Sequence, residues 1–533
     1  MFLGLIGDSR GVRLPTLGRL TLPATGLLVG ALAWGVMSAP AYADADNPEP
    51  VTATEADATE AASAALDQVQ AILDPETADG TTPAAGESRD LTIALRDLRL
   101  RQSDLPRTQR AQARTLLQRP PAAYGWTSEQ SKPFTSVVVH WDLNKTPMTN
   151  VDDAGAVADH VLATYAAAGY RPPMSDGTVG GDSKLDIYLV DFGAAGHPEL
   201  YGFCDASELP PQDGPYNTPA YCAFDHDFAN FPQRSWIENL KVTAAHELFH
   251  ATQFAYDYTE DAWFMEATAT WAEDEVYDEI NDNRQYLATS PLRQPSQALD
   301  QFDSSGRQYG EWIFFRYLSE RFPEAQGELP VIVRKMWERA DSSRGPVYDS
   351  YSIQAVSREL ASRGTDLRRV YAQFGAANRR PGRTYEEGSS YPKARAERSW
   401  TFSPKRHDTR WQVAKLDHLA TKTLQVKPSR SMKHWRLRVV VDLPNKKRGV
   451  AAIVTTYDKQ GRPAGKFVPI SKRGNGKAQV VFNARKVKRV DVTLSNAGIR
   501  YARCWRDVEH HYSCSGTPKD DKRPMRYRIT AVR

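Results

Sequence analysis

The segment His246-Glu247-Leu248-Phe249-His250 constrains this chain more than any other feature. Its two histidines are four residues apart. On a helix they therefore lie about 40° apart on one face, where two imidazole nitrogens can reach one tetrahedral metal ion. Glu247 lies about 100° round the helix from His246, too far to be a ligand but close enough to take a proton from water at the metal. The pattern predicts a helical zinc site with Glu247 as general base.

The residues on either side of this pattern are uncharged, both in 242–245 and in 251–255. A helix that is apolar all round is typical of a buried position beneath a site. The alternative interpretation is an amphipathic helix whose histidines pair with polar groups of the core. Glu247 would then be buried without an evident partner, which is costly, so the metal site is the preferred hypothesis.

Two histidines leave such a site one protein ligand short. A metzincin would supply a third histidine in the continuation H-x-x-G-x-x-H, but Gln253 stands at the glycine position and Tyr256 at the histidine position. No further histidine follows His250 until His407. We therefore expect the third ligand to be a carboxylate from the next helix, which gives a His2Glu set.

The segment 263–274 predicts this second helix and carries two glutamates on one face, Glu266 and Glu273. Either carboxylate could bind the metal. Glu266 is the expected ligand because it stands among apolar residues, where an unpaired charge is costly. Glu273 is expected to support a ligating histidine from behind, and a solvated position is the alternative for it.

The pattern His246-Glu247-x-x-His250, followed by the run from Trp263 to Ala269, resembles the gluzincin branch of the zincin metallopeptidases. In that branch two histidines and a glutamate on the next helix bind zinc, and the motif glutamate activates water. The resemblance implies a zincin-like catalytic domain and hydrolysis of peptide bonds. Thermolysin-like members have an aspartate four residues after the ligand glutamate, whereas this chain has Thr270. Further stretches resemble an uncharacterised group of secreted bacterial metallopeptidases, namely 137–141, 185–191 and 385–392.

A peptidase of this type also needs a donor for the oxyanion that forms during attack on the peptide bond. A tyrosine is expected, because no histidine lies between His250 and His407. Tyr309 is the first choice, since some gluzincins use a tyrosine in a similar downstream place. Packing in the core is the competing interpretation of Tyr309, and Tyr286 and Tyr317 are rival donors.

The N-terminal residues 1–43 predict a secretory signal peptide. Arginines precede an apolar stretch at 20–36, and Ala41-Tyr42-Ala43 fits a small-x-small cleavage site. A membrane anchor is the alternative, but the stretch is short and rich in glycine. Four cysteines agree with export, and their local pairing predicts the disulfides Cys204–Cys222 and Cys504–Cys514.

The rest of the chain divides into three parts, which together predict an α+β fold. Residues 44–119 begin with an acidic stretch and continue as a basic helical pattern, which indicates a propeptide or a disordered spacer. Residues 120–398 predict the zincin-like metallopeptidase domain, a small sheet with helices. Residues 399–533 alternate with period two between turn signals, which predicts an all-β sandwich.

The sandwich segment is strongly basic. Residues 401–533 hold 32 Lys and Arg against 9 Asp and Glu, a net charge of +23, so the rest of the chain carries −20 of the total +3. Such a domain could dock on an anionic surface, a cell-wall polymer or lipid headgroups. No nucleic-acid motif is present, and nucleic acid is not the expected partner. The charges could also merely keep a secreted domain soluble. The oligomeric state is not predicted.

The leading functional hypothesis is a secreted zinc endopeptidase that acts on protein or peptide substrates. A catalytically inactive zincin scaffold that binds a cell surface or wall is the alternative, and hydrolysis of another amide, such as wall peptide, is a third. A calcium ion could bind near Asp176, Asp182 and Asp186, although a solvated turn is favoured. His140 and His226 are interpreted as structural or substrate-facing.

Overall fold

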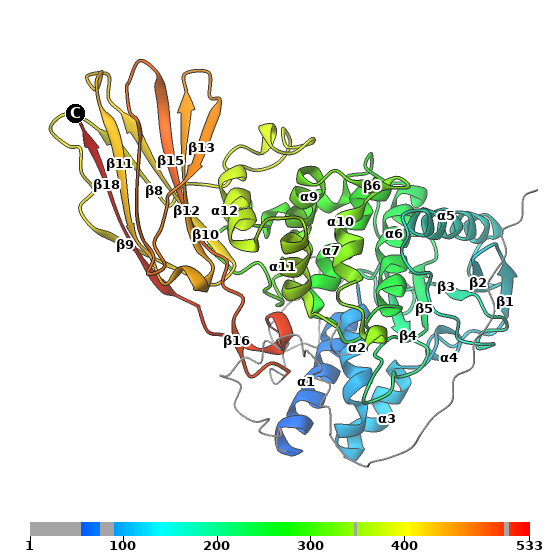
Figure 1. Ribbon diagram of the computed structural model, residues 1–533. Helices are drawn as coiled ribbons and strands as arrows, with labels where there is room; N and C mark the ends of the chain where they lie inside the picture. Colours follow the sequence, from blue (N-terminus) through cyan, green and yellow to red (C-terminus); the bar gives the residue numbers. More distant parts are fainter. Residues whose placement is uncertain (1–54, 75–89, 346–348, 506–510) are drawn as a thin grey trace, which may run out of the picture. The chain divides into compact units, whose positions relative to one another are not determined.

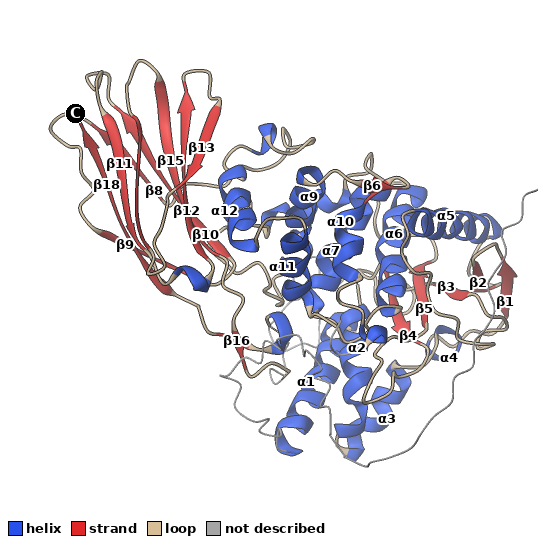
Figure 2. Cartoon of the chain, viewed as in Figure 1, coloured by secondary structure: helices blue, strands red, loops and turns tan. Residues whose placement is uncertain are grey.

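The structure, a computed structural model, describes residues 55–74, 90–345, 349–505 and 511–533 (Figure 1). The expected signal peptide at 1–43 lies outside these residues, as do 44–54 and 75–89. Helices and a sheet form the first part of the described chain, and strands form the last part (Figure 2). This arrangement confirms the α+β class. None of the described helices is both long and apolar enough to cross a bilayer.

A five-stranded sheet with the order β1-β2-β3-β5-β4 carries the first part of the fold. Strands β2, β3 and β5 run parallel, whereas β1 and β4 are antiparallel to their neighbours and form the two edges. Runs rich in β-branched, apolar and aromatic residues at 136–140, 185–192 and 221–224 predict β2, β3 and β5, whereas no such run predicts either edge strand. The strands are β1 (Glu129–Pro133), β2 (Val137–Asp142), β3 (Leu185–Val190), β4 (Gly202–Ala206) and β5 (Ala220–Asp225).

Helices bury this sheet on both faces. On one face α5 (Met148–Ala167) and α6 (Trp236–Phe254) share a core with Ile187 and Leu189 of β3. Tyr188 and Val190 of the same strand point the other way, into a core formed with the N-terminal helices. Alternate side chains of a strand point to opposite faces, so all four can be apolar and buried. The N-terminal helices are α1 (Glu55–Leu73), α2 (Thr92–Arg101) and α3 (Arg107–Leu116).

The described part of 44–119 is therefore helical and packed. The short helix η1 (Gln102–Asp104) completes it, and α4 (Pro120–Ala123) follows and leads into β1. These residues are not a disordered spacer, because their leucines and alanines supply the apolar layer that one face of the sheet needs. Whether the segment is cleaved off stays a prediction.

The second half of the α/β region, residues 120–398, is helical. It begins with α7, which lies against α6, and its remaining helices pack into the same core. Its elements are α7 (Ala262–Val276), η2 (Asp282–Ala288), α8 (Arg307–Gly310), α9 (Trp312–Arg321), β6 (Ala325–Gln326), β7 (Leu329–Pro330), α10 (Val331–Trp337), η3 (Ser342–Arg344), α11 (Ser352–Ser362), α12 (Leu367–Ala377) and η4 (Pro381–Arg383).

Two sheets then form a β-sandwich with its own apolar core. One has the order β13-β12-β15-β10-β8 and the other β14-β11-β18-β9. The strands are β8 (Arg398–Phe402), β9 (Gln412–Leu416), β10 (Ala420–Pro428), β11 (Arg436–Asp442), β12 (Val450–Asp458), β13 (Pro463–Phe467), β14 (Asn475–Val481), β15 (Val487–Asn496) and β18 (Arg523–Val532), with η5 (Lys446–Arg448) in one turn.

Both predicted disulfides are present. Cys204 and Cys222 form a cross-strand pair that ties the edge strand β4 to β5. Cys504–Cys514 closes a loop that leaves the sandwich between β15 and β18. That loop contains β16 (Tyr501–Ala502), η6 (Ser513–Ser515) and β17 (Thr517–Pro518), and its Tyr501 and Cys514 are buried in the core of the α/β region.

A buried ion pair joins this loop and the sandwich to the α/β region. Asp300 lies 2.7 Å from Nε2 of His418 and accepts hydrogen bonds from the Tyr501 hydroxyl and from the backbone N–H of Ser513, at 3.1 Å. Burial alone lowers the pKa of His418, but the carboxylates of Asp300 and Asp521 outweigh it and raise that pKa to about 10.

We expect the substitution His418→Gln to lower the Tm most near neutral pH. The pKa of His418 is raised in the folded state, so its stabilising effect is complete below the ordinary value of 6.5 and is lost as the pH rises towards about 10. Thermal unfolding of wild type and variant between these two pH values should show a Tm difference that shrinks. His434→Gln, at an exposed site in the sandwich, is the control. A difference independent of pH would contradict the charged pair.

Candidate metal centre

Helix α6 presents the H-E-x-x-H motif from the middle of the core of the α/β region. Ser235 and Glu238 begin the helix with a capping box, in which each side chain accepts a hydrogen bond from the backbone N–H of the other residue. From Asn239 onward nearly every residue of α6 is buried, which explains why the motif's flanks carry no charge. The helix lies between the sheet and α7, so its polar residues can meet only partners from neighbouring elements.

Each motif histidine is oriented through its Nδ1 atom. Nδ1 of His246 lies 2.7 Å from Oε1 of Glu273, one turn before the end of α7. Nδ1 of His250 lies 2.7 Å from Oε1 of Gln253, whose own amide nitrogen donates to the carbonyl of Met265 at 3.0 Å. Both Nδ1 atoms therefore face acceptor oxygens and carry the proton, which leaves the Nε2 lone pairs free.

The two Nε2 atoms converge. They lie 3.1 Å apart, and Glu266 Oε2 is 3.3 Å from Nε2 of His246, while its Oε1 is 3.7 Å from Nε2 of His250. Glu266 is 1% exposed, and neither of its oxygens makes a hydrogen bond with any described residue. Two lone pairs that face each other beside a buried carboxylate repel unless a cation lies between them.

A fourth group, which the sequence did not suggest, completes this cluster. Asp90 precedes α2, and its Oδ2 lies 3.5 Å from Nε2 of both histidines. The four ligand atoms of Asp90, His246, His250 and Glu266 all lie within 4.8 Å of one another, and all four residues are buried. The donor set suits a tetrahedral metal ion, so the described residues contain a buried site that could hold one.

The raised pKa values of both histidines also show that the surrounding groups favour positive charge at this place. Burial lowers the pKa of His250, but the carboxylate of Glu266 and that of Asp90 raise it to about 10. The pKa of His246 also lies well above its ordinary value, because Asp90, Glu266 and Glu273 outweigh the effect of burial. Protons on these rings would partly neutralise the surrounding carboxylates, and a divalent cation would neutralise them more completely.

Glu247 lies beside the cluster and outside it. Burial, followed by the charge of Asp90, raises its pKa well above the ordinary value. Its Oε2 accepts a hydrogen bond of 3.1 Å from the Thr92 hydroxyl. A side chain at Gly202 would come within 3.3 Å of Cγ of Glu247 and 2.8 Å of the Ala223 carbonyl. The absence of a side chain at this position thus brings the edge strand β4 close to the motif glutamate.

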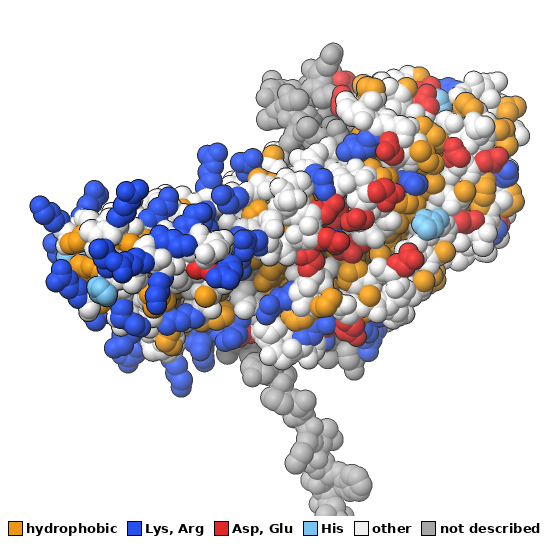
Figure 3. Space-filling model, turned by 90° about the horizontal axis from the view of Figure 1, so that it is seen from above, with side chains coloured by type: hydrophobic (Ala, Val, Ile, Leu, Met, Phe, Trp, Pro, Cys, Tyr) orange, Lys and Arg blue, Asp and Glu red, His pale blue; other side chains and the backbone are white. Residues whose placement is uncertain are grey.

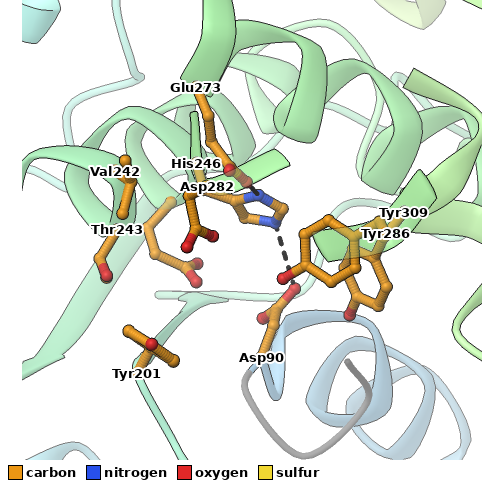
Figure 4. Close-up of a pocket in the computed structure, with 10 residues that line it drawn as sticks. Asp90, Tyr201, Val242, Thr243, His246, Glu273, Asp282, Tyr286 and Tyr309 are labelled. Carbon is orange, nitrogen blue, oxygen red and sulfur yellow. Dashed lines mark hydrogen bonds and ion pairs between the residues drawn. The ribbon is translucent and has the colours of Figure 1, made fainter. Parts of the chain in front are cut away.

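A narrow pocket opens beside His246 and Glu247 (Figure 4). Tyr309 and Tyr286 line it, with Asp90, Glu273 and Tyr201. The rings of Tyr309 and Tyr286 stack with centroids 5.1 Å apart, and the Tyr309 ring lies 6.1 Å from that of His246.

Two of the three tyrosines suggested as oxyanion donors therefore reach the site. The third, Tyr317, packs against Phe374 and Tyr385 in the core and does not line the pocket. Gly310 makes the arrangement of the other two possible, since a Cβ there would lie 2.7 Å from the Tyr286 carbonyl.

The remaining residues singled out in the sequence lie elsewhere. His140 pairs with Asp186 at 2.9 Å and stacks on Tyr188, and His226 lies 3.3 Å from Asp227. Asp176 and Asp186 both pair with Arg119. Among the described residues, the groups that could hold a metal do not include the aspartates considered for calcium. Thr270 is buried in α7, and Glu273 has the orienting role towards His246.

Asp90 and Gln253 are the members that sequence reasoning missed. Asp90 Oδ1 accepts a hydrogen bond of 2.7 Å from the backbone N–H of Thr92, at the start of α2. An aspartate just before a helix is ordinarily a cap, so nothing local marks it as a ligand. Gln253 carried a usable signal, since it lies three residues after His250 and thus on the same face of α6.

We expect substitutions of Glu266 and Glu273, both on α7, to lower the metal affinity by different amounts. Glu273 touches the metal only through His246, so Glu273→Ala should weaken binding by about 10–100-fold. Loss of a ligand costs more, and Glu266→Ala should weaken it by more than about 100-fold. Metal content after dialysis and competition with a chromophoric chelator measure both, with Glu279→Ala, an exposed glutamate just after α7, as the control. Equal affinities in all three variants would contradict this site.

Comparison with known proteins adds little to this geometry. No protein-family model matches the chain, and no curated protein matches it. Among solved structures, the chain is similar to a family GH115 4-O-methyl-α-glucuronidase with specificity for decorated arabinogalactans, at 8% identity and a TM-score of 0.14. That match covers 56% of this chain and 38% of the glucuronidase chain. A likeness this slight carries no argument about activity, and the case for function rests on the metal centre.

Proposed function

We propose that the protein is a zinc-dependent endopeptidase that is exported from the cell. The observation that carries the proposal is the convergence of His246 Nε2 and His250 Nε2 at 3.1 Å beside the unpartnered carboxylate of Glu266, with Glu247 next to them. Two imidazoles and a carboxylate are a donor set typical of catalytic zinc. Export is supported by the two disulfides, because such bonds persist in oxidising compartments.

The residues around the cluster suit hydrolysis of an amide. Glu247 is not a member of the ligand set, so its carboxylate is available for proton transfer. As a general base it takes the proton of the attacking water and delivers it to the leaving amine. Tyr309, on the opposite wall of the pocket, donates a hydrogen bond to the oxyanion that develops on the peptide carbonyl. A metal ion held by His246, His250 and Glu266 would polarise the carbonyl as a Lewis acid and would make the water more acidic. The buried Glu247 gives no advantage to a scaffold that only binds a surface.

The decisive comparison is hydrolysis of casein by the wild type and by Glu247→Gln. Asp90 lies against both histidines and could occupy a position at the metal. Activity with and without Glu247→Gln is therefore measured both in the natural sequence and in an Asp90→Ala background. We expect Glu247→Gln to keep its metal and to lose activity by about 100- to 10,000-fold, since it removes proton transfer alone. A chelator should abolish activity, and zinc should restore it. Hydrolysis that survives both treatments in both backgrounds would exclude this function.

The basic sandwich supports a second element of the proposal, attachment to an anionic surface. Lys and Arg side chains are spread over the sandwich, and acidic side chains gather farther along the molecule (Figure 3). Arg436 and Arg438 are exposed on β11, one on each side of a residue that points into the core. We propose that this domain holds the peptidase on a cell-wall polymer or on lipid headgroups that carry negative charge.

We expect binding to anionic vesicles or isolated cell walls to fall steeply between low and physiological salt, because exposed charges are screened beyond about 8 Å at 0.15 M ionic strength. The double substitution Arg436→Glu/Arg438→Glu should reduce sedimentation with these particles and leave casein hydrolysis unchanged. Vesicles of neutral lipid serve as the control. Binding that is insensitive to both salt and the double substitution would contradict attachment through this domain.

A further inference from the structure

The segment from Asp90 to Thr92 contacts three parts of the candidate site. It lies at the start of α2 and beside the edge strand β4, where it also reaches residues of α6. It meets the metal position, the edge of the sheet and Glu247 through three separate contacts.

The first contact is with the metal position. Oδ2 of Asp90 lies 3.5 Å from each histidine Nε2, makes no hydrogen bond with any described residue, and is buried. With His246, His250 and Glu266 it completes a set of four protein ligands. A zinc site with four protein ligands is closed, whereas a catalytic zinc site keeps one position open for water or substrate.

The second contact is with the edge of the sheet. Asp90 forms an isolated parallel bridge with Gly202, the first residue of β4. The Thr92 hydroxyl accepts a hydrogen bond of 2.9 Å from the backbone N–H of Cys204 on the same strand. An edge strand beside a metal centre is the place where an extended peptide pairs with the enzyme backbone. Here the chain itself occupies that edge.

The third contact is with the general base. The same Thr92 hydroxyl that accepts from Cys204 donates to Oε2 of Glu247 at 3.1 Å. A hydrogen bond of this kind engages a lone pair of the carboxylate that would otherwise be available to accept a proton.

Helix α2 holds the segment in place. Arg96 is buried, and its guanidinium donates to the Glu260 carbonyl at 2.7 Å, close to the start of α7. Arg99 pairs with the buried Asp205 of β4. These contacts tie α2 both to the helix that carries Glu266 and to the edge strand, so the segment cannot leave without breaking two buried polar links.

From these contacts we infer that residues 90–92 are a built-in plug, which keeps the metal centre closed until Asp90 leaves the ligand set. The inference rests on the proposed function and makes the described part of 44–119 an inhibitory segment as well as a layer of the fold. The active form is the one in which the Asp90 carboxylate has given up its place to the water and the carbonyl of a peptide.

The test uses cobalt(II), whose visible absorption reports the number and kind of ligands, in the full chain. Acetohydroxamate, a small bidentate metal ligand, probes whether a coordination position is open. We expect Asp90→Ala and Asp90→Asn to keep cobalt, to change its visible spectrum, and to bind acetohydroxamate at least about tenfold more tightly than the wild type. The control is Asp104→Ala, an exposed aspartate of the same segment, which should behave like the wild type.

Three results would overturn the plug, and they differ from one another. If wild type and Asp90 variants have the same cobalt spectrum and the same hydroxamate affinity, Asp90 is not a ligand. If only the Asp90 variants lose cobalt, Asp90 is a permanent ligand of a closed site. If neither the wild type nor the variants bind cobalt, the metal centre itself is wrong, and the proposed function fails together with the inference.

Discussion

The structure of the α/β region depends on one electrostatic constraint, the meeting of two imidazole Nε2 atoms at 3.1 Å inside a protein core. Glu273 and Gln253 fix the rings from behind, so that neither histidine can turn away. Glu266 adds a buried negative charge. Without a cation this arrangement would be strongly unfavourable, because water cannot screen the charges there. A divalent ion converts the same groups into a stabilising cluster.

The surrounding fold explains how such a cluster can be buried. The capping box begins α6, and α7 follows it directly, so local sequence brings the two histidines and Glu266 together. Packing from both sides of the sheet then excludes water. The N-terminal helices belong to that packing, and the residues before α2 bring Asp90 to the metal position along the edge strand β4. Support for the fold and closure of the site thus come from the same segment.

Sequence reasoning was most effective where the chemistry is local. The i, i+4 spacing of His246 and His250 and the seven-residue spacing of Glu266 and Glu273 have fixed meanings on helices, and the period-two pattern after residue 399 indicates a sandwich. Asp90 lies 156 positions before His246 and imitates a helix cap, so no periodicity reveals its long-range contact. Strand β4 is not predicted from the sequence for a similar reason. Its five residues include a glycine and an aspartate, which are uncommon in strands, and burial comes from tertiary packing.

X-ray absorption at the zinc edge, on protein purified without chelators, tests the central claim most directly. The account predicts about one zinc ion per chain, with imidazole nitrogens and carboxylate oxygens at about 2.0–2.2 Å. In Asp90→Ala the imidazole scattering should persist while the oxygen shell changes. Protein that contains no metal after growth in ample zinc, or a spectrum without imidazole scattering, would contradict the account.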